Sequence, residues 1–425
     1  MLALLLMLMC AGSTASQDLE SSWRAALQNS LAFGNRDPRF ASAAHGLAAV
    51  LLDQGKNQEA KQLLETALPV LETSLGSEHK DVVLCGFRLA KCYAYLGQYP
   101  EAETLLLKTK PAMERVFGST DPRFAEVLVT LGILYRVTVR CRESEAVLSR
   151  AIKIFEACSG VDARLKGLAQ AELGSTYYNL GKHQEAIYFL RQGLKVLKDL
   201  EATESGFFLI NIASAYFALG QLNQADIALR RTLTILSSHP EMYDLKTLTL
   251  AKLSLVKLGQ SRRGEAEFYI RQAKDIAETN KLVLGVRLSL LDSLGNLYCA
   301  EGDLSRCGEA YQSALDLVLS TAGPLNPDTA EIYRTLGKLR IREKRLDAAA
   351  LCYEKTMEIA EKALPQSHPL YATYLSEYAA LLRKLKRKDQ SKQLELRARM
   401  IREQNPSQRL AGATVDVDEL QNQPR

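Results

Sequence analysis

Histidine and cysteine are the side chains of this sequence that are most able to bind a metal or act as nucleophiles, and their spacing supports neither role. No two histidines stand three or four residues apart, so no helix face presents a pair of metal ligands. The chain also has no GxSxG motif and no glycine-rich phosphate loop. We therefore expect no catalytic residue, no metal site and no cofactor. A catalytic triad assembled from distant parts of the chain is the alternative that would make the protein an enzyme.

The cysteines suggest core packing rather than redox chemistry. Besides Cys10 there are seven, and none forms a CxxC motif. Cys85 and Cys92 lie two helical turns apart, about 10 Å along a helix axis, which is beyond the reach of a disulfide. We interpret most of the seven as small hydrophobic residues in a helical core. An odd number of thiols argues against an exported protein.

The elements that would position any site are repeated pairs of helices. Residues 167–200 contain two helical patterns joined by a short turn at Gly181, each with an apolar face at i, i+3, i+4 and i+7. Nine such units follow one another, with spacings of 42, 42, 42, 39, 41, 41, 42 and 42 residues. A small residue opens each second helix: Ala60, Ala102, Ser144, Ala186, Ala225, Ala266, Cys307, Ala349 and Ser391. Small residues also stand seven residues after and twelve residues before each of these, and we call all twenty-seven the seam positions.

This pattern resembles the tetratricopeptide repeat, in particular the 42-residue variety of kinesin light chains. The match is carried by LG-x-x-Y runs at residues 131–135, 173–177 and 294–298, and it covers residues 39–403. Four repeats lack the first-helix tyrosine, with Leu51, Lys257, Arg340 and Leu382 in its place. Four lack the turn glycine and have Val139, Ser261, Lys344 and Lys386. The resemblance implies an all-α, right-handed solenoid, and armadillo or HEAT arrays are the structural alternative for this period.

The first helices carry a second stripe of side chains besides the seam. In the resembled family first helices line a concave groove, and inner asparagines there often bind a peptide backbone, so the stripe marks candidate partner-binding residues. Packing against the next repeat is the alternative role for the stripe. The candidates are aromatic, amide or basic: Tyr95, Tyr178, Asn179, Asn211, Phe217, Asn296, Arg334, Lys338, Arg342, Arg383 and Lys384. Glu331 is the one acid that we identify among the inner positions of the last two repeats, so we expect the partner to carry an acidic segment there.

The positive charge of the chain gathers at one end. Residues 383–403 carry nine basic and three acidic side chains, whereas the whole chain has a net charge of +5. The remaining sequence is therefore close to neutral, and we expect no general affinity for nucleic acid. A nucleic-acid or anionic-surface binder acting through this basic last repeat remains the alternative.

The two ends differ from the repeats. Residues 1–16 begin with an apolar run of eleven residues, which suits a cleaved export signal and is too short to span a bilayer. Residues 17–38 are expected to form a capping helix with Trp23, and residues 404–425 are expected to be disordered. Export is favoured by the apolar run and a cytoplasmic location by the cysteines. His79, His239 and His368 lie in connections between repeats, where we expect surface side chains.

We therefore predict a non-catalytic scaffold of about nine repeats, residues 39–403, that binds a protein or peptide partner in its groove. A regulatory module that responds to a bound peptide is kept beside this prediction. The sequence predicts no transmembrane segment.

Overall fold

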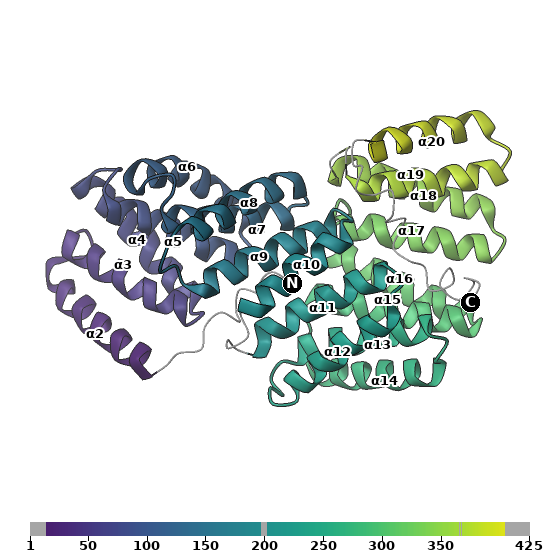
Figure 1. Cartoon of the computed structure of the whole chain (residues 1–425), viewed down its shortest axis with the longest axis horizontal. Helices are drawn as coiled ribbons and strands as arrows, with labels where there is room; N and C mark the ends of the chain where they lie inside the picture. Colours follow the sequence, from purple (N-terminus) through teal and green to yellow (C-terminus); the bar gives the residue numbers. More distant parts are fainter. Residues whose placement is uncertain (1–13, 197–201, 365, 367, 404–425) are drawn as a thin grey trace. The chain divides into compact units, whose positions relative to one another are not determined.

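The computed structural model describes residues 14–196, 202–364, 366 and 368–403, and these residues form helices joined by short turns, without strands (Figure 1). The predicted ends at residues 1–13 and 404–425 lie outside the described residues. The first helices of repeats one to nine are α3 (Pro38–Asp53), α5 (Lys80–Tyr95), α7 (Pro122–Val137), α9 (Ala163–Asn179), α11 (Ala202–Ala218), α13 (Tyr243–Gly259), α15 (Leu284–Glu301), α17 (Pro327–Arg342) and α19 (Pro369–Lys384). The second helices are α4 (Asn57–Leu75), α6 (Tyr99–Phe117), α8 (Cys141–Ala157), α10 (His183–Val196), α12 (Leu222–Leu236), α14 (Arg263–Thr279), α16 (Leu304–Thr321), α18 (Leu346–Ala363) and α20 (Lys388–Glu403).

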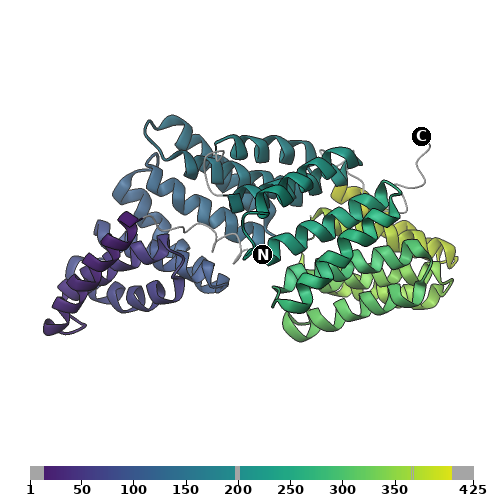
Figure 2. The same ribbon diagram turned by 90° about the horizontal axis from the view of Figure 1, so that it is seen from below.

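The seam positions hold each helix pair together, as predicted. All nine residues that open the second helices are buried, with at most 2% of their surface exposed. The two serines that open second helices bond across the pair: Ser144 Oγ donates to the carbonyl of Gly132 at 2.7 Å, and Ser391 Oγ donates to that of Ala379 at 2.8 Å. Each first helix therefore lies against the second helix of its own repeat, which both views show (Figures 1 and 2).

An additional helix, α2 (Thr14–Ser30), precedes the repeats and is followed by a single 3₁₀ turn at Leu31–Phe33. Its Trp23 lies directly over Gly46 of α3, where a side-chain carbon on Gly46 would come within 2.6 Å of the indole ring. The contact needs glycine because any larger residue would push the ring away. We propose that α2 caps the first repeat.

Side chains before several of the first helices supply the N-caps. Asp37 and Asp121 accept the backbone N–H two residues on, each at 2.8 Å, and also hold the arginine of the repeated DPR sequence. His368 does the same for α19 with Nδ1, at 3.2 Å. The prediction of a surface position is wrong for His368, which is buried, and burial lowers its pKa to about 4. Its capping bond explains why a histidine is buried there.

The chain divides into two compact units. Unit 1 consists of Met1–Leu173 and Gln192–Glu204, and unit 2 consists of Gly174–Arg191 and Ser205–Arg425. The division passes through the fourth helix pair, α9 and α10. Each unit is a solenoid of helix pairs, so the all-α solenoid is confirmed within both units.

The turns within the repeats require a left-handed backbone. The turn glycines Gly55, Gly97, Gly181, Gly220 and Gly302 have φ between 70° and 82°. The four residues that replace glycine keep the same conformation, with φ of 64° at Val139, 59° at Ser261, and 62° at Lys344 and Lys386. The register predicted from the sequence thus holds even where the glycine is missing.

Replacing Val139 with glycine should therefore stabilise unit 1. A left-handed conformation costs an L-residue roughly 1–2 kcal/mol, and glycine removes this strain. Glycine also gives the unfolded chain more conformational entropy, which offsets about half of the gain in stability. We expect a net gain of about 0.5–1 kcal/mol in the free energy of unfolding, measured by denaturant titration. Val139→Ala is the matched control, since alanine keeps the Cβ atom that causes the strain. An equal gain in the alanine variant would contradict the explanation.

Candidate functional site

A groove in unit 2, with a cavity volume of about 240 Å³, is the candidate site. Its walls come mainly from the first helices of five successive repeats, α9, α11, α13, α15 and α17, with contributions from α12 and α16. The lining residues are Tyr178, Ala213, Ser214, Phe217, Leu229, Lys252, Leu255, Val256, Asp292, Asn296, Cys299, Tyr311, Glu331, Arg334, Thr335, Lys338, Leu339 and Arg342. Six of the eleven predicted site residues are among them.

One part of the groove is apolar and aromatic. Tyr178 of α9, Phe217 of α11 and Leu255 of α13 line it, each from the inner stripe of its helix. Burial raises the pKa of the Tyr178 hydroxyl, so this group stays a neutral hydrogen-bonding group. These side chains could accept apolar residues of a bound segment, with the Tyr178 hydroxyl as a polar end.

The amide side chains are less free than the sequence implied. Asn296 lines the groove, but its Nδ2 donates to the carbonyl and to Oδ1 of Asp292, at 2.8 and 3.2 Å. Asn211 donates to Ser175 Oγ at 3.0 Å, across neighbouring first helices, and does not line the groove. Asn179 is exposed at the end of α9. Of the three asparagines, Asn296 therefore offers its remaining polar atoms to a ligand in the groove.

The basic end of the groove is an ion-pair network. Arg334 has 6% of its side chain exposed and bridges Glu331 of its own helix and Glu377 of α19, the latter at 3.0 Å. Lys338 Nζ lies 3.3 Å from the same Glu377 carboxylate, and Tyr374 donates its hydroxyl to Glu331 at 2.9 Å. The expectation that Glu331 is the one acid among these inner positions is wrong. Packing of α19 against the preceding repeat brings Glu377 next to Arg334 from 43 residues away.

Two charged groove residues were not among the predicted site residues. Lys252 of α13 and Asp292 of α15 both line the groove. Burial lowers the pKa of Lys252, and burial together with the Glu331 carboxylate raises the pKa of Asp292 to about 6, against the effect of Arg334 and Lys252. The helical spacing in the sequence could have identified both residues as part of the inner stripe. Lys252 lies four residues after Leu248 and three before Leu255 in the inner stripe, and Asp292 lies one turn before Asn296.

The remaining predicted residues are dispersed. Arg342 lines the groove and donates to the carbonyl of Cys299 at 3.1 Å. Arg383 and Lys384 are exposed at the end of α19, outside the groove lining, and Arg383 pairs with Glu395. Tyr95 belongs to unit 1 and is buried, with Lys91 Nζ 5.9 Å from the centre of its ring. The predicted set therefore does not form one continuous surface.

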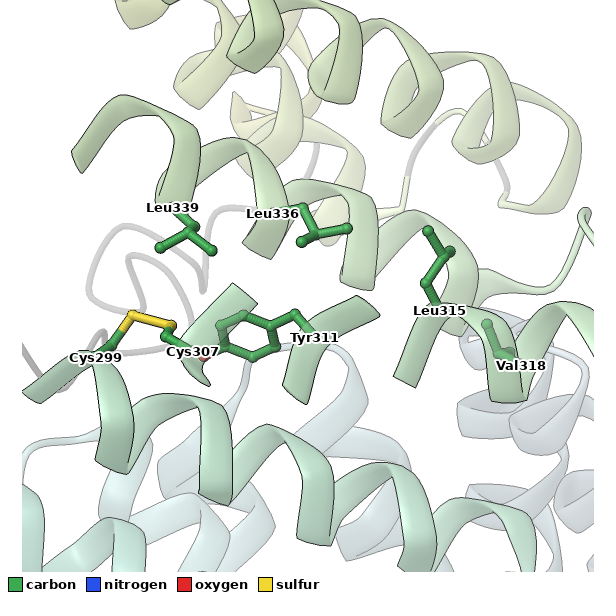
Figure 3. Close-up of a cluster of buried hydrophobic side chains, with 7 residues drawn as sticks. All are labelled: Cys299, Cys307, Tyr311, Leu315, Val318, Leu336 and Leu339. Atoms are coloured by element: carbon green, nitrogen blue, oxygen red, sulfur yellow. A yellow bond between two sulfur atoms is a disulfide. The ribbon is translucent and has the colours of Figure 1, made fainter. Parts of the chain in front are cut away.

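A disulfide stands in the groove wall. Cys299, near the end of α15, is bonded to Cys307 at the start of α16, with the Cα atoms 5.2 Å apart. Figure 3 shows this bond beside Tyr311, with Leu336 and Leu339 of the next first helix opposite. Core packing of single cysteines is thus the wrong interpretation for these two. It fits Cys85 and Cys92, which are buried and whose pKa burial raises to about 12.

The described residues contain neither a cluster of metal ligands nor a membrane-spanning helix. No three His, Cys, Asp or Glu side chains gather there in a way that could hold a metal ion. None of the described helices combines the length and apolarity needed to cross a bilayer.

Comparison with known proteins gives a consistent result. The profile of the tetratricopeptide repeat matches residues 39–115, 82–157, 123–199 and 286–362, which together exceed half of the chain. Protein KINESIN LIGHT CHAIN-RELATED 2 of Arabidopsis thaliana is 23% identical over 367 residues, covering 82% of this chain and 54% of that protein. The chain spans about half the length of the curated relatives that it matches.

Two solved structures share the helical fold over most of the chain. A Rap protein complexed with the competence and sporulation factor has a TM-score of 0.63 at 14% identity, covering 88% of this chain and 100% of its own. The apo form of the quorum sensor NprR from B. thuringiensis has a TM-score of 0.60 at 14% identity, covering 81% of this chain and 98% of its own. At these identities the two structures bear on the fold alone.

Proposed function

Because this chain belongs to the tetratricopeptide repeat family of protein–protein interaction scaffolds, we propose that unit 2 binds an extended segment of a partner protein in its groove. One observation carries the proposal: five successive first helices line one groove with both apolar and charged side chains. A groove of this kind suits an extended chain, because each repeat contributes side chains for a further part of the ligand.

The apolar part of the groove would supply most of the affinity. Tyr178, Phe217 and Leu255 can enclose one or two apolar side chains of the ligand, and burial of apolar surface contributes about 25 cal/mol for each Å². Asn296 and the Tyr178 hydroxyl would then fix the orientation of the ligand backbone through hydrogen bonds.

We also propose that the partner segment carries an acidic residue, although the cations that would contact it differ from those predicted from the sequence. Arg334 and Lys338 already pair with Glu331 and Glu377, so their charge is largely neutralised within the protein. Lys252 is a further cation in the groove lining, and we assign the acidic preference to it. Arg383 and Lys384 lie outside the groove lining and would act mainly on the rate of association.

A regulatory module that responds to a bound ligand is the second candidate. It is favoured by the fold shared with a Rap protein that is complexed with the competence and sporulation factor, and with the quorum sensor NprR. Both candidates use the same groove and differ in what binding does to the rest of the chain. The members of this family generally act as interaction modules rather than as catalysts, and we propose no reaction for the groove.

Filling the groove should abolish peptide binding. Ser214 lies on α11 in the groove lining, and an arginine there would occupy the space between Tyr178 and Phe217. We expect Ser214→Arg to lose at least about tenfold of the binding to peptides selected by the wild-type chain from a random 12-residue display library. Ile227→Arg is the matched control, since Ile227 is 60% exposed on α12 and does not line the groove. Equal binding by both variants would show that the peptides bind elsewhere.

A further inference from the structure

Lys252 and Asp292 differ from every other charged pair around the groove. They lie on neighbouring first helices and line the same cavity, and each shifts the pKa of the other, yet no ion pair of 4.0 Å or less joins them within the described residues. Among the described residues, Lys252 Nζ has no hydrogen-bond or ion-pair partner. Asp292 accepts one side-chain hydrogen bond, from Asn296 of its own helix, at 3.2 Å. The groove thus holds a cation and an anion with a gap between them.

The other charges nearby do not fill that gap. Arg334 is held by Glu331 and Glu377, and Lys338 is held by Glu377 as well. Arg342 donates to the backbone carbonyl of Cys299, which lies two helical turns after Asp292 on α15. Lys252 and Asp292 therefore attract each other as groove charges that no ion pair joins directly.

Two partly buried charged groups that lack a direct ion-pair partner lower the stability of the protein when no ligand is bound. Withdrawing charged groups from water is unfavourable unless each finds a partner, and both groups here respond by shifting toward the neutral form. A ligand that brings an anion to Lys252 and a cation to Asp292 would offset that cost at both ends. A purely acidic ligand would satisfy Lys252 and leave Asp292 facing another carboxylate.

We propose that Lys252 and Asp292 form a dipolar subsite that binds an acidic and a basic side chain placed two residues apart on the bound segment. This inference rests on the proposed function, since it names the chemistry of the segment that the groove takes. The spacing follows from extended backbone, in which residues i and i+2 point to the same side about 7 Å apart. Neighbouring packed helices lie 8–10 Å apart, which a pair of long charged side chains at that spacing can bridge.

A charge swap tests the subsite directly. The random 12-residue display library is selected against the wild-type chain and against Lys252→Glu/Asp292→Lys, and the enriched peptides are sequenced. The wild-type chain should enrich an acidic and a basic residue two positions apart in one fixed order. The swapped variant should enrich the reverse order. Asp292→Asn should lose the basic preference and keep the acidic one, with binding of a selected wild-type peptide about 10- to 100-fold weaker.

Controls separate this inference from the proposed function. Lys355→Glu/Glu358→Lys swaps an exposed ion pair on α18 and should leave the enriched pattern unchanged. If the swapped groove variant does not fold, Lys252→Gln and Asp292→Asn carry the test, each removing one preference. A different result is that the enriched peptides lose binding to Ser214→Arg and yet carry no acidic and basic residue two positions apart. That result would overturn the dipolar subsite and leave the proposed function standing. Failure to enrich any groove-dependent peptide would overturn the proposed function and the subsite with it.

Discussion

Replacing Arg334 with leucine should destabilise unit 2 by about 3–5 kcal/mol, because it leaves two carboxylates without their shared partner. The guanidinium is almost fully buried and contacts Glu331 and Glu377, at 3.0 Å in the second case. Lys338 can still pair with Glu377, whereas Arg334 is the cation that pairs with Glu331 in the described part of the chain. Denaturant titration of the full chain would measure the loss.

The pH dependence of this effect has a definite sign. Burial alone would raise the pKa of Glu331, but Arg334 and the Tyr374 hydroxyl hold it below the ordinary value of 4.5. In the wild-type chain the carboxylate therefore contributes stability above pH 4.5, and that contribution is lost as the pH falls through its lowered pKa. Without Arg334 the pKa should rise instead. The difference in stability between the two chains should be largest at neutral pH and should shrink below about pH 4.5.

The matched control removes the acids together with the base. Arg334→Leu/Glu331→Gln/Glu377→Gln removes both carboxylates that Arg334 had neutralised, and it leaves Lys338, which is partly exposed to water, as the remaining charge of this network. Most of the lost stability should therefore return. If the triple variant is as unstable as Arg334→Leu, packing of the arginine stem rather than charge pairing holds this part of the groove. Charge reversal at Arg334 is therefore unsuitable for binding experiments. It would destabilise unit 2, so a loss of binding could not be assigned to a lost contact with the ligand.

The sequence predicted the helix pairs and turns well because these depend on local rules. The fixed spacing of small residues predicted which positions are buried between the two helices of a pair. The repeat register also located the left-handed turn residue, even where it is Val139 or Lys344 instead of glycine. The spacing of the small residues within each unit favoured the tetratricopeptide repeat over armadillo or HEAT arrays, and the profile match agrees. Both features follow from steric limits on close helix contacts and on backbone torsion, which repeat in every unit.

Pairing between repeats was much harder to predict. The stripe on each first helix indicated which residues face inward, but it did not fix which side chains meet. The contact of Arg334 with Glu377 depends on the rotation of α19 against α17, and a sequence pattern of one helix holds no information on that angle. The disulfide was missed for a related reason. Cys299 and Cys307 are eight residues apart, and the turn at Gly302 folds the chain back so that they face each other.

Substitution of Gly174, a seam position of the fourth repeat, should have the other large effect on folding. A side-chain carbon there would lie 2.8 Å from the backbone nitrogen of Leu190 and 3.0 Å from the carbonyl oxygen of Ala186, so the conflict is with backbone that cannot turn aside. Gly174→Leu should cost about 3 kcal/mol or more in the free energy of unfolding, and even Gly174→Ala should be destabilising. Thermal unfolding would measure both.

Two other glycines make suitable controls for this prediction. At Gly132 the nearest atoms belong to the Leu148 side chain, which can move, so Gly132→Ala should cost less than Gly174→Ala. At Gly264 no heavy atom lies within 4 Å of the added carbon, and the higher helix propensity of alanine should make Gly264→Ala stabilising by about 0.5–1 kcal/mol. This order of the three alanine variants is the expected result, and a cost at Gly132 equal to that at Gly174 would contradict it.

The reach of the Gly174 substitution along the chain follows from the way a solenoid is stabilised. Each helix pair packs mainly on its neighbours, so forcing α9 and α10 apart should weaken repeats three to five and leave the distant repeats intact. Hydrogen exchange of Gly174→Leu should therefore show faster exchange in α7–α12 and unchanged protection in α3 and α18. Uniform loss of protection over residues 39–403 would mean that the repeats unfold as one cooperative body, and the nearest-neighbour description would then fail for this chain.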